Sequence, residues 1–129
     1  DEIVGPVNAL MAEHDAVVLT QDWHPADHSS FASNHSGAQP FGTATLPYGD
    51  QVLWPDHCVI GSDGAAFHPG LDLRRADLIV RKGFRREIDS YSAFFENDHR
   101  TRTRSSHATL EVNGTRHPLS PPGAGSRAP

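Results

Sequence analysis

The residue types and spacing around Asp22 and His24 suit a metal-binding site. The pattern D-x-H-x3-H joins Asp22, His24 and His28, and His57 follows later in the run W-P-D-H-C. In an extended backbone, Asp22 and His24 point to the same face because their positions differ by two residues. A carboxylate and imidazoles are ligands for borderline divalent ions such as zinc or iron. Because the chain has nine histidines, hydrogen bonding to loop backbone stays open as an alternative role for these residues.

Two short apolar runs are expected to position these side chains. Residues 16–20 (AVVLT) precede Asp22, residues 77–81 (DLIVR) precede Lys82, and both runs predict short β-strands. In an open α/β sheet, ligands bind outside the carboxyl ends of the strands. If both strands are parallel, Asp22 and Lys82 therefore lie at the same edge of the sheet. Lys82 could instead be an ordinary solvated basic residue.

The remaining pattern predicts one helix and one long loop. Residues 2–14 carry apolar side chains at helical spacing, and a helix followed by a strand is half of a parallel βαβ unit. Residues 23–76 are rich in Gly, Pro, Ser and His and show little regular pattern. Because this loop also carries many large apolar side chains, we expect a bound metal to order it.

Composition limits the classes of protein to which the chain could belong. Its 129 residues suffice for one domain, and no run approaches the ~18 apolar residues of a membrane span. Residues 1–98 carry a net charge of −9, which argues against nucleic acid as a partner, whereas residues 99–129 carry +4. The single cysteine, Cys58, excludes an intramolecular disulfide and fits a reducing compartment. No secretory signal is visible, so we expect a cytoplasmic protein without a membrane or nucleic-acid partner.

Four motifs together resemble the nicotinamidase/pyrazinamidase family of isochorismatase-like cysteine hydrolases. They are VVLTQDWHP (17–25), FASNH (31–35), WPDHC (54–58) and RKGF (81–84). The resemblance covers roughly residues 1–100 without a break. The pair D-W-H-P and W-P-x-H-C distinguishes nicotinamidases from isochorismatases, which are similar in fold but lack the metal ligands.

The resemblance implies a three-layer α/β, isochorismatase-like fold with a parallel sheet, incomplete in this chain. Enzymes of this family hydrolyse nicotinamide and pyrazinamide-like amides to the acid and ammonia, as a step of NAD salvage. A divalent metal, Zn or Fe with Mn as a further option, binds the pyridine nitrogen. A cysteine thiolate attacks the carboxamide, an aspartate acts as its base and a lysine completes the triad. The implied partner is nicotinamide, and a homo-oligomer is a further expectation.

Matching this sequence to the family's motifs assigns roles to individual residues. The resemblance implies metal ligands, a triad lysine and ring-sandwiching aromatics: Asp22, His24 and His57, with His28 matching a ligand of some members, then Lys82, then Trp54 and Tyr91. By default the two aromatic residues would be core side chains, and only their family positions place them in a pocket.

Two family elements have no counterpart in the sequence. The strand with the catalytic aspartate would precede Asp1, and the nucleophilic cysteine would follow residue 100. We therefore expect residues 1–100 to be a partial nicotinamidase domain that is inactive alone, and residues 101–129 to be a divergent, disordered tail. Alternatives are a non-catalytic metal-binding remnant and a hydrolase in which the metal activates water.

Cys58 is predicted to be a small, buried structural thiol. It directly follows His57, and neighbouring residues of an extended segment point to opposite faces. The two side chains therefore cannot easily share a proton as a nucleophile and its base.

Overall fold

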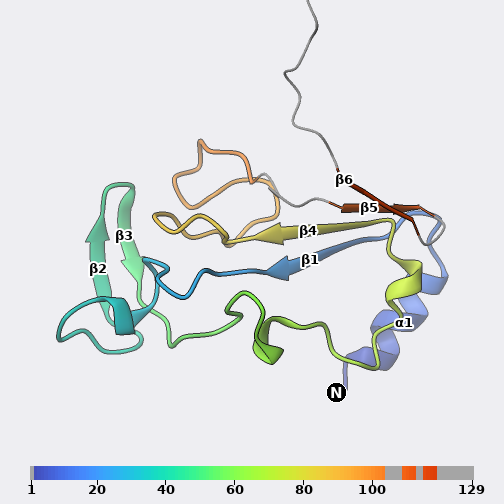
Figure 1. Ribbon diagram of the computed structural model, residues 1–129, viewed down its shortest axis with the longest axis horizontal. Helices are drawn as coiled ribbons and strands as arrows, with labels where there is room; N and C mark the ends of the chain where they lie inside the picture. Colours follow the sequence, from blue (N-terminus) through green and yellow to red (C-terminus); the bar gives the residue numbers. More distant parts are fainter. Residues whose placement is uncertain (1, 104–108, 113–114, 119–129) are drawn as a thin grey trace, which may run out of the picture.

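The structure, a computed structural model, describes residues 2–103, 109–112 and 115–118 (Figure 1). No helix within these residues is both long and apolar enough to cross a membrane. The elements in chain order are α1 (Val4–Ala12), β1 (Val18–Asp22), η1 (Ala32–Asn34), β2 (Thr43–Leu46), β3 (Gly49–Val52), η2 (Asp63–Ala65), η3 (Leu73–Arg75), β4 (Leu78–Lys82), β5 (Thr109–Val112) and β6 (Thr115–Pro118), where η marks a short 3-10 turn.

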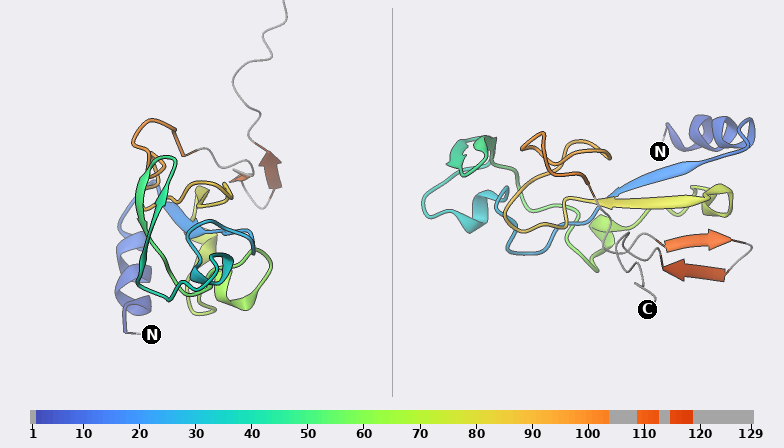
Figure 2. Two further views of the ribbon diagram at one scale, coloured as in Figure 1. Left: turned by 90° about the vertical axis from the view of Figure 1, so that its left-hand side faces the viewer. Right: turned by 90° about the horizontal axis from the view of Figure 1, so that it is seen from above.

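β1 and β4 form a parallel pair at the centre of the molecule. Their register runs from Val18 opposite Leu78 to Asp22 opposite Lys82. β5 and β6 extend the sheet beyond β4 by antiparallel pairing, giving the order β1-β4-β5-β6 (Figures 1 and 2). The predicted α/β class with a parallel sheet is confirmed. Each strand begins and ends later than its predicted apolar run, and backbone pairing continues as far as the polar residues Asp22 and Lys82.

Part of the segment predicted to be a tail forms strands. β5 and β6 occupy residues 109–112 and 115–118, and β5 pairs with β4. The prediction of disorder for residues 101–129 otherwise falls mainly on residues outside the described part of the chain. It stays a prediction, as does the domain boundary at residue 100.

α1 confirms the helix predicted over residues 2–14, although the helix is shorter. Pro6 lies in its first turn, where a missing N–H removes no intrahelical hydrogen bond. Asn8 attaches the helix to the loop before β4: its Nδ2 donates to Gly70 O at 2.8 Å, and its Oδ1 accepts from Asp72 N at 2.8 Å. These bonds hold α1 beside the parallel strand pair (Figure 2).

The long segment between β1 and β4 folds back to the end of β1. β2 and β3 form an antiparallel hairpin, so the segment contains more regular structure than expected. Two isolated parallel bridges follow, between His24 and Val59 and between Phe31 and Trp54. The two sequence stretches that carry the predicted metal ligands therefore run side by side.

The interior beyond the carboxyl ends of β1 and β4 is largely polar. Phe31 and Leu53 are fully buried there, together with buried polar side chains: His24, His28, Ser30, Gln51, Asp89, Ser90 and Glu96. Burial of such groups costs free energy unless they find hydrogen-bond or ligand partners. Their concentration at one end of the strand pair identifies the region in which a functional site is expected.

Candidate metal and substrate site

A pocket of about 220 Å³ lies beyond the carboxyl ends of β1 and β4. Its lining is mainly polar and aromatic: Asp22, His24, Trp54, His57, Lys82, Asp89, Ser90 and Tyr91. Six of these are site residues predicted from the sequence, and the remaining predicted residue, His28, is fully buried next to His24. The structure therefore brings the predicted residues together, while their roles stay predictions.

His24 lies at the centre of a group of imidazoles. Its ring centroid lies 4.5 Å from that of His28 and 4.8 Å from that of His57. His24 Nδ1 lies 2.8 Å from Gly83 O. Because a carbonyl oxygen can only accept, Nδ1 donates and Nε2 is the nitrogen left for a ligand.

His28 and His57 use the same ring nitrogen for their hydrogen bonds. His57 Nδ1 donates to Pro55 O at 2.8 Å, whereas His28 Nδ1 lies 2.7 Å from Ser30 Oγ and accepts from Ser30 N at 3.3 Å. His28 Nε2 is buried without a hydrogen-bond partner, which costs free energy. Metal-bound histidines commonly donate their second ring nitrogen to a carbonyl or carboxylate, as His24 and His57 do here. His24 and His57 therefore fit a metal ion held by their Nε2 atoms, whereas neutral His28, whose Nδ1 accepts, carries its proton on Nε2.

Burial keeps two of these imidazoles neutral. Desolvation lowers the pKa of His28 to about 4, with the nearby His24 as a second cause. Desolvation also lowers the pKa of His24, partly offset by its hydrogen bond to Gly83. A metal requires a neutral imidazole, so both rings have the charge state that metal binding needs at neutral pH.

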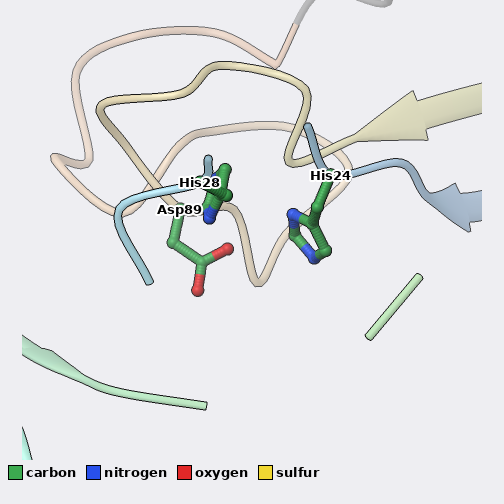
Figure 3. Close-up of side chains that lie close together, drawn as sticks. All are labelled: His24, His28 and Asp89. Carbon is green, nitrogen blue, oxygen red and sulfur yellow. The ribbon is translucent and has the colours of Figure 1, made fainter. Parts of the chain in front are cut away.

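Asp89 is a candidate ligand that the sequence analysis missed. One potential ligand atom from each of His24, His28 and Asp89 lies within 4.8 Å of the others, and all three residues are buried (Figure 3). The Asp89 carboxylate accepts from Gln51 Nε2 at 3.2 Å and from Ser90 N at 2.8 Å. Its position in the segment after β4, at the edge of the sheet where ligands bind, was the sequence feature that could have indicated this role.

Asp22 lies outside that cluster and pairs with Lys82 instead. Lys82 Nζ donates to Asp22 Oδ1 and, at 3.0 Å, to Ser90 O. The strand register causes this contact, because Asp22 and Lys82 are directly opposite each other. The resulting pair combines a predicted metal ligand with the predicted triad lysine in the pocket wall.

Trp54 and Tyr91 meet edge to face at one side of the pocket. Their ring centroids lie 6.3 Å apart at an interplanar angle of 78°, and Trp54 Nε1 donates to Tyr91 Oη at 3.1 Å. Tyr91 is 58% exposed, so one side of the pocket is accessible to solvent. The predicted sandwiching of a substrate ring stays a prediction.

Cys58 is half-buried and is not among the residues that line the pocket. Desolvation raises the pKa of its thiol, and the negative charge of Asp22 adds to this effect more than Lys82 opposes it. A thiol with a raised pKa is a poor nucleophile at neutral pH. The prediction that Cys58 is not the nucleophile agrees with this environment, although its burial is only partial.

No protein-family model matches the chain. Two curated nicotinamidases are nevertheless similar to it in sequence. That of Acinetobacter baylyi is 60% identical over 103 residues, and that of Escherichia coli is 47% identical over 107 residues. Each match covers 80% of this chain, but only 48% and 50% of the respective relative. The chain thus spans about half the length of the curated relatives that it matches.

Solved structures give a consistent result. A nicotinamidase/pyrazinamidase of Acinetobacter baumanii has a TM-score of 0.78 at 57% identity, covering 80% of this chain and 50% of its own. Yeast nicotinamidase bound to the inhibitor nicotinaldehyde has a TM-score of 0.70 at 33% identity, covering 78% and 54%. A pyrazinamidase of Pyrococcus horikoshii in complex with zinc has a TM-score of 0.52 at 28% identity, covering 73% and 45%. Over about 80% of its length, this chain is therefore similar in sequence and in fold to about half of a nicotinamidase.

Proposed function

We propose that this chain supplies the metal- and ring-binding part of a nicotinamidase, which hydrolyses nicotinamide and pyrazinamide-like amides to the acid and ammonia. One observation carries the proposal: two imidazoles with available Nε2 atoms, those of His24 and His57, and a carboxylate-bound lysine gather at a single pocket. A pocket of about 220 Å³ suits a small molecule. The similarity to nicotinamidases over about 80% of the chain supports the same activity.

The proposed metal ligands are Asp22, His24 and His57, with His28 as a further candidate and Asp89 as the alternative carboxylate. Imidazole and carboxylate ligands suit Zn or Fe, with Mn as a further candidate. The zinc complex of the P. horikoshii pyrazinamidase supports zinc in particular. When bound, the ion would act as a Lewis acid toward an electron pair of the substrate, such as that of a pyridine nitrogen.

Lys82 is the proposed catalytic residue of this chain. Its ammonium group is held in the pocket wall by the Asp22 carboxylate and the Ser90 carbonyl. A fixed positive charge stabilises the negative charge that develops on an attacking nucleophile or on the carboxamide oxygen. Because two acceptors already orient Lys82 Nζ, this charge needs little reorganisation during the reaction.

Trp54 and Tyr91 are the proposed substrate-binding residues. Both line the pocket, and the hydrogen bond between them fixes the position of one ring against the other. Contact between a heteroaromatic substrate and such rings contributes about 0.5–1.5 kcal/mol beyond the area buried. Nicotinamide is thus the proposed partner, and cytoplasmic NAD salvage is the proposed setting.

A non-catalytic metal-binding protein is the second candidate, and the environment of Cys58 favours it for this chain acting alone. Among the described residues, no thiol lines the pocket, and the Cys58 thiol has a raised pKa. The chain alone is therefore proposed to bind metal and nicotinamide without turning the amide over.

Metal content and ligand binding of the full 129-residue chain test the proposal. We expect about one zinc- or iron-class ion per chain after dialysis, and a metal-dependent NMR shift of Trp54 on addition of nicotinamide. His24→Ala should abolish both effects. His14→Ala is the matched control, because His14 is exposed and does not line the pocket. A folded wild-type chain that binds neither metal nor nicotinamide would overturn the proposal.

A further inference from the structure

Gly83 leaves no room for a side chain beside His24. It is buried directly after β4 and has φ +68°, a backbone conformation that favours glycine. A Cβ atom placed on Gly83 would lie 2.3 Å from His24 Cε1 and 2.6 Å from His24 Nδ1. Even alanine at this position would therefore have to displace the imidazole.

The backbone of Gly83 also determines which nitrogen of His24 carries the proton. His24 Nδ1 lies 2.8 Å from Gly83 O, inside the protein. A carbonyl oxygen has no proton to give, so the neutral ring must carry its proton on Nδ1. The lone pair of Nε2 is then available for a metal ion.

The strand pair places these two residues together. Asp22 is opposite Lys82, and Trp23 N donates to Lys82 O at 2.9 Å. Residues His24 and Gly83 each follow directly from this end of the ladder. The carboxyl end of β4 thus supplies the lysine of the pocket and, through the carbonyl of Gly83, orients its histidine.

We infer that Gly83 is a positioning residue for metal binding, holding His24 in the Nδ1-protonated form through its carbonyl and admitting the ring by its lack of a side chain. This inference rests on the proposed metal site. Metal affinity then depends on the carbonyl and the missing side chain of Gly83, as well as on the side chains that bind the ion.

Two glycine variants of the full chain provide a matched test. Gly83→Ala and Gly61→Ala both put alanine at a positive φ, since Gly61 has φ +80°, but no atom lies within 4 Å of a Cβ on Gly61. We expect Gly83→Ala to weaken Co²⁺ and Zn²⁺ binding by about 10- to 100-fold, the usual effect of changing a group that orients a metal ligand. Gly61→Ala should bind both ions like the wild type. Equal affinities of the two folded variants would overturn the inference.

If Gly83→Ala does not fold, the protonated ring nitrogen of His24 in the metal-free wild type tests the inference instead. Nitrogen-15 NMR of the histidine rings should show His24 protonated on Nδ1, with the signals assigned by their loss in His24→Gln. Protonation on Nε2 would contradict the inference. If the wild type binds no metal but His24 is protonated on Nδ1, the metal site is wrong and only the contact with Gly83 survives. Tight metal binding by both glycine variants would instead support the metal site and refute only the role of Gly83.

Discussion

Gln51 donates a hydrogen bond to Asp89, although the two residues belong to different parts of the fold. Gln51 Nε2 lies 3.2 Å from Asp89 Oδ2, and both side chains are buried. Gln51 is part of β3 in the small hairpin, whereas Asp89 follows β4 of the main sheet. The same amide nitrogen lies 2.9 Å from Tyr91 Oη. Gln51 therefore connects a candidate metal-binding carboxylate with a proposed ring-binding side chain.

Gln51→Leu is expected to lower the free energy of unfolding by about 1–3 kcal/mol, because it leaves a buried carboxylate oxygen of Asp89 without its donor. Urea unfolding would measure the loss. Gln39→Leu is the control, since Gln39 is exposed and should change stability little. Equal stabilities of the two variants would show that the buried amide contributes nothing.

Lys82 and Asp22 should be energetically coupled. Lys82→Met is expected to cost about 1.5–3 kcal/mol, the range for hydrogen bonds to charged groups. Asp22→Asn should then cost less in the Lys82→Met background than in the wild type, because its partner is already gone. A double-mutant cycle by urea unfolding measures this difference.

The exposed pair of Arg74 and Asp72 is the control for that cycle. Arg74 Nε lies 2.7 Å from Asp72 Oδ1, and the arginine side chain is 90% exposed, so water screens the pair. Coupling between Lys82 and Asp22 no larger than that of this surface pair would contradict a role for the lysine as a fixed charge in the pocket.

His28 should make the stability of the metal-free chain depend on pH. Its folded pKa of about 4 lies below its ordinary value of 6.5, so between these values the unfolded state binds more protons than the folded state. Stability therefore falls as the pH falls from 6.5 to about 4, by about 3 kcal/mol for this group. His24 acts in the same direction, because its pKa is also lowered.

The measurement is urea unfolding in the presence of a chelator, at several pH values across this window. His28→Gln should make the stability profile flatter, whereas His14→Gln, at an exposed position, should leave it unchanged. An unaltered profile in His28→Gln would show that the buried imidazole is not the group that titrates.

Asp22→Asn and Asp89→Asn distinguish the two candidate carboxylate ligands. We expect Asp22→Asn to weaken zinc binding by at least about tenfold and Asp89→Asn to have a smaller effect. Asp89 already accepts from Gln51 and Ser90 through its two oxygens, whereas only Oδ1 of Asp22 pairs with Lys82. Isothermal titration of both variants provides the comparison, and the reverse ranking would assign the carboxylate ligand to Asp89.

The sequence predicted the strand ends well because the signal there is local. Short apolar runs followed by Asp22 and by Lys82 predicted two strands whose polar ends meet, and the register confirms this arrangement. This local signal does not bring His24 and His57 together. Only the family resemblance predicted that these two residues lie near each other. The structure explains their proximity by the bridge between His24 and Val59, a non-local pairing with no periodic signal in the loop.

The contributions of Gly83, Gln51 and Asp89 could not be predicted in the same way. Each depends on where a loop returns after leaving a strand, which is a property of the tertiary fold. Gly83 acts through its carbonyl and its missing side chain, so its residue type indicated only a turn. Gln51 resembles a surface residue in a short polar strand, yet the hairpin folds it against Asp89.

Cys58 should be dispensable for everything this chain does alone. The full chain is expected to bind zinc but to release no ammonia from nicotinamide, because its single thiol has a pKa raised by burial and does not line the pocket. Cys58→Ala should therefore bind zinc with unchanged affinity and remain inactive in a coupled ammonia assay. Ammonia release by the wild type that disappears in Cys58→Ala would make Cys58 the nucleophile. Release that persists in Cys58→Ala but stops with a chelator would show that the metal site alone catalyses hydrolysis. That result would refute the proposal that this chain binds metal and nicotinamide without hydrolysing the amide.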